Sequence, residues 1–172
     1  FVEFISAGNL ILMLVFTAGI SLILGMGLPT TANYIVVSSL MAPVIVSVGA
    51  SNGLIVPLIA VHLFVFYFGI LADDTPPVGL AAYAAAAISG GDPIRTGIQG
   101  FTYDIRTAIL PFMFIFNTEL LMIGITSTVH LVMVIVTATT AMLLFAAATQ
   151  GFFLTRNKYW ETAVLLIITF TF

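Results

Sequence analysis

The sequence predicts an all-α integral membrane protein: a multi-span helical bundle with a discontinuous helix and a re-entrant helical hairpin. Composition supports the membrane assignment, since 61% of the 172 residues are hydrophobic, 6% are charged and the mean hydropathy is +1.23. A soluble domain carries about 25% charged residues. Two Gly/Pro-rich interruptions of the apolar runs predict the broken helices: residues 25–31 (GMGLPTT, the first break) and residues 73–79 (DDTPPVG, the second break).

Three apolar runs without Asp, Glu, Lys or Arg surround the first break: residues 4–24, 32–48 and 54–71. Each predicts a helix, and residues 4–24 are long enough to cross a bilayer, which takes about 20 residues. A turn over residues 49–53 separates the second run from the third. His62 lies within the third run without a second His or Glu at metal-ligand spacing, so we expect it to hydrogen-bond to a neighbouring helix.

The segment after the second break is too short to span a membrane. Residues 78–89 make a helix of about 18 Å, whereas the hydrocarbon core measures about 30 Å. This length predicts a re-entrant hairpin over about residues 54–89, with residues 75–77 at its tip inside the membrane. The alternative is an interfacial loop at the end of a full span.

Helix-start signals follow at Asp92, a typical N-cap residue, and Pro93, at the first helical position. The helix that begins there should end near Asn117. A polar stripe marks one of its faces: Arg95, Gln99, Thr102, Tyr103 and Arg106. Further predictions are a short helix over 119–123, a span over 130–149 and a polar connection over 150–158. The last apolar run, 159–172, is shorter than a span, so we expect the chain to be a fragment of a longer polypeptide.

The residues that several other function classes require are absent from the sequence. The net charge of −3 comes without a basic cluster, which argues against nucleic-acid binding, and the absence of Cys excludes disulfides and thiolate chemistry. Neither Gly-x-Ser-x-Gly nor His-Glu-x-x-His occurs. An intramembrane aspartyl protease needs a Tyr-Asp motif followed by a later Gly-x-Gly-Asp motif on facing helices. Here Gly-Gly-Asp92 comes before Tyr-Asp104 and lies in a polar turn, which leaves a hydrolase as a remote alternative. We therefore expect that the protein is not an enzyme and that it binds no cofactor.

The breaks themselves predict a solute site. Unwound backbone at membrane depth survives only inside protein or beside a water-filled cavity. Its carbonyl oxygens suit a cation such as Na⁺, and the N-terminus of the following helix suits an anion. Asp73 and Asp74 beside the second break indicate an ion pathway. Each of these predictions has an alternative. The first break could be an ordinary loop between two spans, and Asp73 and Asp74 could cap a span at the water interface. The protein as a whole could then be a non-transporting membrane scaffold or assembly subunit.

Three stretches resemble one family. They are GMGLPTTANYIVVSSLMAPVI (residues 25–45), HLFVFYFGILADDTPPVGLAAYAAAAISGGDPIRTG (62–97) and LPFMFIFNTELLMIG (110–124). These stretches resemble the large membrane subunit of TRAP transporters (DctM-like), most closely the fused permease that works with TAXI-type binding proteins. The resemblance implies that residues 1–125 form the C-terminal half of an elevator-type transport domain. Residues 126–172 would then be additional C-terminal membrane helices, truncated here.

The resemblance also implies a function: Na⁺-coupled import of organic acids, with amino and oxo acids as candidates, across a prokaryotic inner membrane. The expected partners are a periplasmic TAXI-type binding protein, the remaining half of the permease and the lipid bilayer. The expected Na⁺ ligands are Gly25, Gly27, Thr30, Thr31, Thr75 and Pro76. The expected substrate contacts are Thr31, Asn33, Asp74, Thr75 and Pro77.

Two points depart from the family pattern. The dicarboxylate and sialic acid branch commonly has an acidic residue at the position of Pro29, so its cation-site details do not transfer directly. The family architecture also places Arg95 outside, against the weak cytoplasmic indication from the loop charges at Arg95, Arg156 and Lys158. H⁺ is the alternative coupling ion because of the paired acids Asp73 and Asp74.

Overall fold

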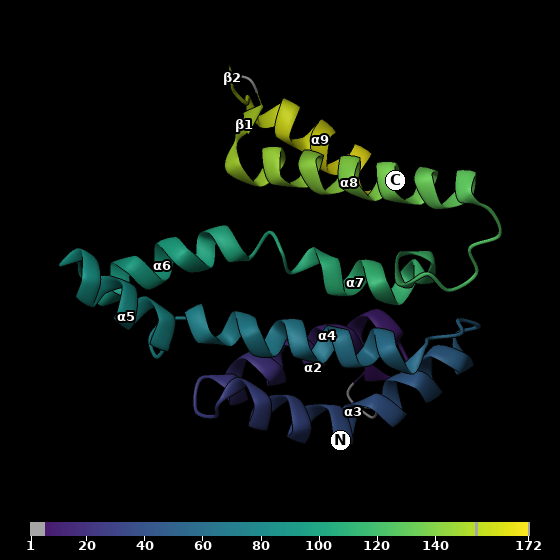
Figure 1. The fold of residues 1–172 in the computed structure, drawn as a ribbon, viewed down its shortest axis with the longest axis horizontal. Helices are drawn as coiled ribbons and strands as arrows, with labels where there is room; N and C mark the ends of the chain where they lie inside the picture. The colour runs from purple at the N-terminus through teal and green to yellow at the C-terminus, as the bar shows by residue number, and fades with distance from the viewer. Residues whose placement is uncertain (1–5, 154, 172) are drawn as a thin grey trace. The chain divides into compact units, whose positions relative to one another are not determined.

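The computed structural model describes residues 6–153 and 155–171, and most of these residues are helical, as predicted (Figure 1). The chain divides into two compact units, the first ending at Thr118 and the second beginning at Glu119. Each unit has its own set of packed helices.

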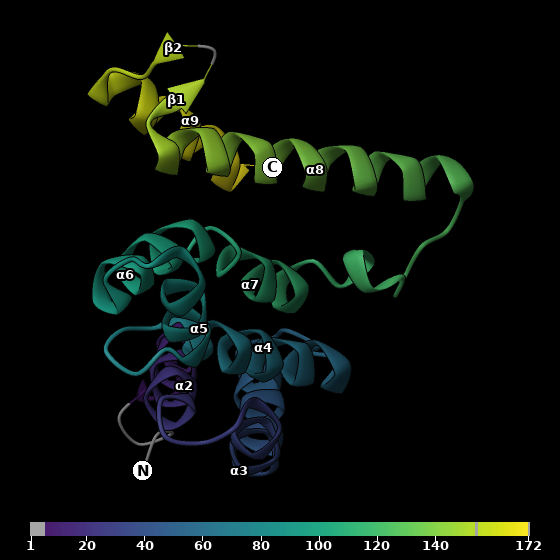
Figure 2. The same ribbon diagram turned by 60° about the vertical axis from the view of Figure 1, so that its left-hand side comes forward.

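A three-helix core dominates the first unit. The elements of this unit are α2 (Leu10–Gly25), α3 (Thr30–Ser51), α4 (Leu58–Leu71), the 3₁₀ helix η1 (Ala72–Asp74), α5 (Leu80–Ser89), α6 (Pro93–Asp104) and α7 (Ile109–Phe116). Helices α2, α3 and α4 pack against one another (Figure 2). The fully buried side chains between them are mainly apolar, including Met13, Leu14, Val37, Ile45 and Phe64. Close packing of such side chains is what holds helices together where the solvent is lipid.

The predicted boundaries of α6 and α7 are confirmed at their outer ends. The Asp92 carboxylate accepts a hydrogen bond from the Arg95 N–H at 2.8 Å, and Pro93 occupies the first turn. Asn117 ends α7. Gly90 ends α5 in the left-handed region (φ 71°), which glycine adopts without the steric cost that a side chain would bring.

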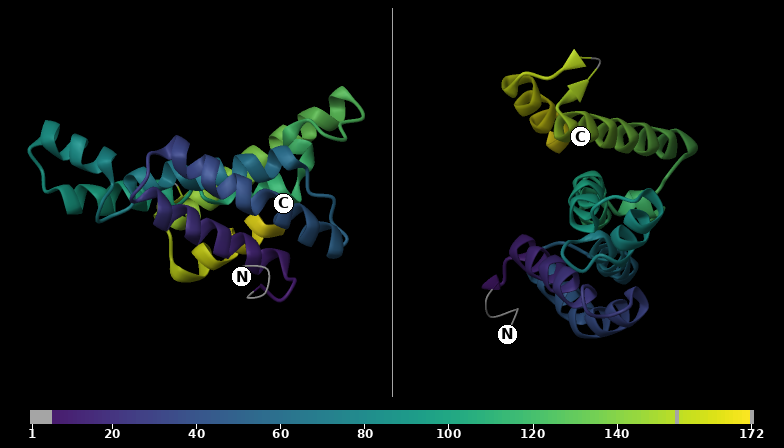
Figure 3. Two further views of the ribbon diagram at one scale, coloured as in Figure 1. Left: turned by 90° about the horizontal axis from the view of Figure 1, so that it is seen from below. Right: turned by 90° about the vertical axis from the view of Figure 1, so that its left-hand side faces the viewer.

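The single helix predicted from residue 93 to about 117 is interrupted by a turn over residues 105–108. Two broken helices therefore follow each other in the chain, α4–η1–α5 and then α6–α7. Helix α5 packs on α6, at one end of this unit (Figure 3), and α4 packs on α7. Edge-to-face ring contacts join α4 to α7, with centroid distances of 5.1 Å for Phe64–Phe112 and 5.9 Å for Tyr67–Phe114.

These packing partners bear on the hairpin predicted over residues 54–89. Its two arms, α4 and α5, lie on either side of the second break and do not pack mainly on each other: α5 packs on the later helix α6, whereas α4 packs on the earlier helices α3 and α2 and on the later helix α7. Helix α5 is short, as predicted: its 10 residues extend about 15 Å. Re-entry of this segment into a membrane stays a prediction.

The second unit is built on one long helix. Its elements are η2 (Thr118–Leu121, beginning at the unit boundary), α8 (Thr128–Gln150), the two-residue strands β1 (Phe152–Phe153) and β2 (Thr155–Arg156), and α9 (Tyr159–Thr171). The strands form a small antiparallel hairpin within the predicted polar connection. Helix α9 packs along α8.

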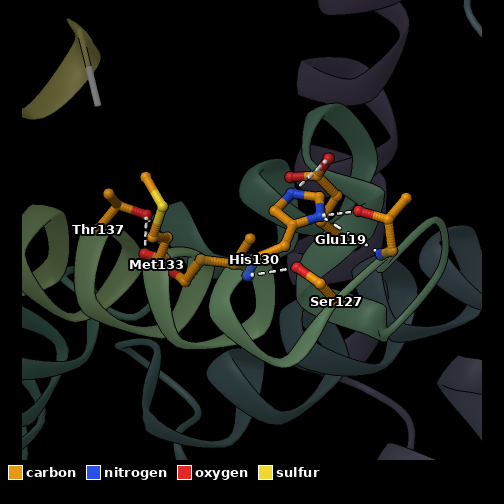
Figure 4. A network of polar contacts seen from close by, with 7 residues as sticks. Glu119, Ser127, His130, Met133 and Thr137 are labelled. Carbon is orange, nitrogen blue, oxygen red and sulfur yellow. Dashed lines mark hydrogen bonds and ion pairs between the residues drawn. The ribbon is translucent and has the colours of Figure 1, made fainter.

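A polar cluster organises the start of α8 (Figure 4). The Ser127 hydroxyl accepts a hydrogen bond from the His130 N–H at 3.1 Å, which caps the helix. The His130 ring nitrogen Nε2 lies 3.3 Å from Glu119 Oε1. Its other ring nitrogen, Nδ1, lies 3.3 Å from the Thr126 hydroxyl. These contacts hold the loop between η2 and α8 against the first turn of the helix.

Among the described helices, α3 with 22 residues and α8 with 23 are long and apolar enough to cross a membrane, by length and composition. Helix α2 has 16 residues, about 24 Å. The span predicted over residues 4–24 lies partly outside the described residues.

Candidate functional site

The first break lies between α2 and α3. Helix α2 ends at Gly25, and the Leu28 N–H then bonds to the Leu24 carbonyl oxygen at 3.0 Å. Pro29 follows in an extended conformation (φ −56°, ψ 145°), and α3 starts at Thr30 without a capping side chain. Proline suits this place because its φ is already that of the helix start and it has no N–H to leave unpaired.

The second break joins α4 to α5 through the 3₁₀ turn η1. The Thr75 hydroxyl donates to the Leu71 carbonyl oxygen at 2.8 Å, which closes the end of α4. From the first turn of α5, the Tyr83 hydroxyl donates to the Pro77 carbonyl oxygen at 3.2 Å. Gly79 precedes α5 and provides no side-chain cap. The first N–H groups of both α3 and α5 are thus left without a capping side chain.

The two breaks meet in the folded chain. The Thr30 hydroxyl donates to Asp73 Oδ2 at 2.6 Å. A cavity of about 300 Å³ lies beside this bond, and both breaks supply its lining: Gly25, Met26, Gly27, Leu28, Pro29, Ala72, Asp73, Val78 and Leu80. The cavity therefore has one carboxylate in a wall that is otherwise backbone and apolar side chains.

Glycine is required where the breaks come closest. A Cβ atom at Gly25 would lie 2.4 Å from the Cβ of Ala72 and 2.7 Å from Asn33 Nδ2. A Cβ at Gly79 would lie 2.8 Å from the Asp73 carbonyl oxygen. Both separations are below van der Waals contact, so a side chain at either glycine would force the backbone segments apart.

The predicted ion ligands fall into two groups. Gly25 and Gly27 line the cavity, and Thr30 contacts it through Asp73. Thr31 is exposed on the first turn of α3 and is outside the lining. The structure thus brings part of the predicted set together, and ion binding by it stays a prediction.

The other predicted residues of the second break face away from this lining. The Thr75 hydroxyl is bonded back to α4, and Pro76 approaches α6, where a Cβ at Gly97 would lie 3.2 Å from Pro76 Cγ. Among the predicted substrate contacts, Pro77 is exposed and Asn33 is completely buried. Neither contributes to the lining.

The two acids of the second break have different neighbours. Asp73 points to Thr30 and the cavity, whereas the Asp74 side chain lies next to that of Asp104 at the end of α6. The two neighbouring acids therefore differ in their surroundings: Asp73 faces the cavity, and Asp74 faces a second carboxyl group.

Sequence reasoning missed two features of this region. It named Asp73 only as part of an ion pathway and put Asp74 alone among the substrate contacts, whereas Asp73 is the acid in the cavity wall. It also missed the turn over residues 105–108, for which polar Asp104, Arg106 and Thr107 in the middle of a predicted helix were the available signal.

The donor set limits the ion chemistry. Within the described parts of the chain, no group of three or more His, Cys, Asp or Glu residues could hold a metal ion. One carboxylate with backbone and hydroxyl oxygens is a hard, weakly charged donor set, which suits a monovalent alkali cation better than a transition metal.

Comparison with known families identifies the chain. The family model described as tripartite ATP-independent periplasmic transporter, DctM component, matches residues 1–131. The model of a domain of unknown function, DUF3394, matches residues 131–172. No curated protein and no solved structure matches the chain. Since the first match covers most of the sequence, the chain belongs to the DctM family, the membrane permease component of tripartite ATP-independent periplasmic (TRAP) transporters.

Proposed function

We propose that this chain forms part of a Na⁺-coupled permease for small organic acids and that the cavity between the two breaks holds the coupling ion. One observation carries the proposal. Thr30 and Asp73, 43 residues apart in sequence, hydrogen-bond beside a cavity that both breaks line. Secondary transporters build their ion and solute sites from discontinuous helices in this way.

The cation site rests on oxygen donors of the first break and on Asp73. Helix α2 ends at Gly25, so carbonyl groups beyond its last turn lack the helical N–H partners that would otherwise occupy them. The Asp73 carboxylate adds the negative charge that favours a cation over a neutral solute. We assign Gly25, Gly27 and Thr30 to this site with Asp73. Thr31, Thr75 and Pro76 stay candidates that would have to turn toward the cavity.

The N-termini of α3 and α5 provide a separate place that attracts the substrate carboxylate. Neither α3 nor α5 has an acidic residue in its first turn or a side-chain cap, and Leu80, the first residue of α5, lines the cavity. Free N–H groups and the helix dipole favour an anion at such ends. The predicted substrate contacts are Thr31, Asn33, Asp74, Thr75 and Pro77, of which Thr31 lies on the first turn of α3.

This arrangement gives a physical reason for coupling. An organic acid that entered alone would be repelled by the Asp73 carboxylate, since like charges at a few ångströms in a poorly solvated site oppose each other strongly. A cation bound at Asp73 removes that repulsion. Cation binding and substrate binding therefore favour each other, which is what symport requires.

The wider assembly follows from the family. DctM components work with a periplasmic binding protein and a small membrane subunit, and the family implies a prokaryotic inner membrane. We propose a TAXI-type binding protein, an elevator-like movement of the transport domain, and amino or oxo acids as substrates.

Uptake into proteoliposomes tests the function. The permease is reconstituted with its partner subunits and offered binding protein loaded with a radiolabelled amino or oxo acid such as glutamate. An inward Na⁺ gradient should drive accumulation, and an equal K⁺ gradient should not. Accumulation that follows a pH gradient and is the same in Na⁺ and K⁺ would reject Na⁺ coupling and favour H⁺.

A further inference from the structure

Asn33 is completely buried one turn after the first break, with none of its surface exposed. Its Nδ2 donates to the Ser21 carbonyl oxygen at 2.8 Å. This bond ties the first turn of α3 to the last turn of α2 across the break. Because the amide is buried away from water, this hydrogen bond is electrostatically stronger than the same bond at the surface.

Glycines on two neighbouring helices make room for this amide. A Cβ at Gly25 of α2 would lie 2.7 Å from Asn33 Nδ2, and a Cβ at Gly69 of α4 would lie 3.5 Å from it. Gly25 also abuts Ala72, the residue just before the second break. The Asn33 amide therefore lies where α2, α3 and α4 meet, next to both breaks and behind the cavity lining.

The amide is an unfavourable choice for packing alone. Among the described residues, none donates a hydrogen bond to Asn33 Oδ1, although this oxygen is fully buried. The amide cannot turn over to avoid this, because Oδ1 would then face the Ser21 carbonyl oxygen. An apolar side chain at this position would leave no buried unpaired acceptor. Residues that cost stability in a packed core are typical of functional constraints.

We propose that Asn33 is a positioning residue of the coupling-ion site: its bond to Ser21 sets the register of α3 on α2 and thereby places the Thr30 hydroxyl on Asp73. Thr30 lies on the same helical turn as Asn33, so a shift of α3 along α2 moves both residues together. The inference rests on the proposed Na⁺ coupling. It assigns Asn33 a role at the helix junction rather than contact with substrate.

The test compares Asn33→Leu with Ser21→Ala in the reconstituted permease. Asn33→Leu removes the tie and keeps a side chain that branches at Cγ. Ser21→Ala is the matched control, because it removes a buried hydroxyl that has no hydrogen-bond partner in the described structure and keeps the carbonyl that Asn33 uses. The readouts are the Na⁺ concentration for half-maximal uptake, the maximal uptake rate and the thermal unfolding midpoint in detergent.

Loss of a residue that orients ion ligands typically lowers ion affinity by about 10- to 100-fold. We therefore expect Asn33→Leu to raise the half-saturating Na⁺ concentration by about tenfold or more, in protein that its unfolding midpoint shows to be folded. Ser21→Ala should leave the half-saturating concentration unchanged. An unchanged Na⁺ dependence in Asn33→Leu would overturn the inference, as would an equal change in both variants.

Should Asn33→Leu fail to fold, Asn33→Ser replaces it, since serine is smaller and too short to reach the Ser21 carbonyl. The Na⁺-induced rise of its unfolding midpoint then gives the ion affinity without transport, and a wild-type affinity would overturn the inference. Failure of the proposed function is visible separately, because the wild-type permease would itself show no Na⁺ dependence.

Discussion

Replacing Gly25 with alanine should force the two breaks apart. The added Cβ would lie 2.4 Å from the Cβ of Ala72 and 2.7 Å from Asn33 Nδ2. Carbon atoms in contact prefer about 3.5–4.0 Å, so α2 and the start of η1 must separate by more than about 1 Å. Neither neighbour can yield cheaply, because the Ala72 Cβ is fixed to the backbone and the Asn33 amide is hydrogen-bonded.

The size of the effect follows from a matched variant on the same helix. At Gly19 a new Cβ meets no heavy atom within 4 Å in the described chain, so Gly19→Ala keeps only the helix-propensity gain, about 1 kcal/mol. Overpacking at Gly25 costs about 1–3 kcal/mol. Gly25→Ala should therefore be less stable than Gly19→Ala by about 1–3 kcal/mol or more, in addition to misplacing the ion site.

The assay is the unfolding midpoint of the purified permease in detergent, together with the initial rate of Na⁺-driven uptake. Gly19→Ala should equal or exceed the wild type in stability and retain uptake. Gly25→Ala should lose most of its uptake and unfold earlier. The reasoning is refuted if Gly25→Ala matches Gly19→Ala in both measurements, since the contact between the breaks would then not depend on the missing side chain.

Three further substitutions probe the same framework. Thr30→Val removes the hydrogen bond to Asp73, and bonds to charged groups contribute about 1.5–3 kcal/mol, so this variant should be less stable and should need more Na⁺ for half-maximal uptake. Thr30→Ser keeps the hydroxyl and should retain the wild-type stability and Na⁺ dependence. Identical behaviour of the two variants would show that the hydroxyl is unimportant. Gly97→Ala adds a Cβ within 3.2 Å of the second break and of α5, so it should lower the unfolding midpoint. Gly100→Ala, with open space around its Cβ, should not lower it. A Gly97→Ala variant as stable as the wild type would contradict the close approach of α6 to the second break and α5. Asp92→Ala removes the N-cap of α6 and should cost about 1 kcal/mol, seen as faster amide hydrogen exchange in its first turn, with Asp92→Asn as the control; unchanged exchange would argue against the cap.

Local signals predicted local structure well. Asp92 and Pro93 specify a helix start through one hydrogen bond and one fixed dihedral, and both act at the positions expected. The two breaks were also predictable, because glycine and proline change the backbone wherever they occur. Thr30 and Asp73 were among the residues named beforehand, although only their proximity in the fold relates them.

The remaining features depend on packing between distant segments. Which of two adjacent acids faces the cavity is decided by the 3₁₀ turn η1, whose tighter winding changes the direction of each side chain, and this turn has no distinct sequence signal here. The pairing of α5 with α6 depends on Gly97, where a missing side chain allows close approach. Such complementarity appears only when both surfaces are known, so a single sequence leaves it open.

Site-specific alkylation tests the central claim most directly. The chain contains no cysteine, so a thiol introduced by Leu28→Cys reports only on the cavity wall. If the cavity closes around the coupling ion, Na⁺ should slow alkylation of this thiol relative to K⁺ at equal ionic strength, while Ile88→Cys, at a residue that is 90% exposed near the far end of α5, should react equally in both salts. Equal alkylation rates at Leu28→Cys in Na⁺ and K⁺ would contradict a cation site between the two breaks.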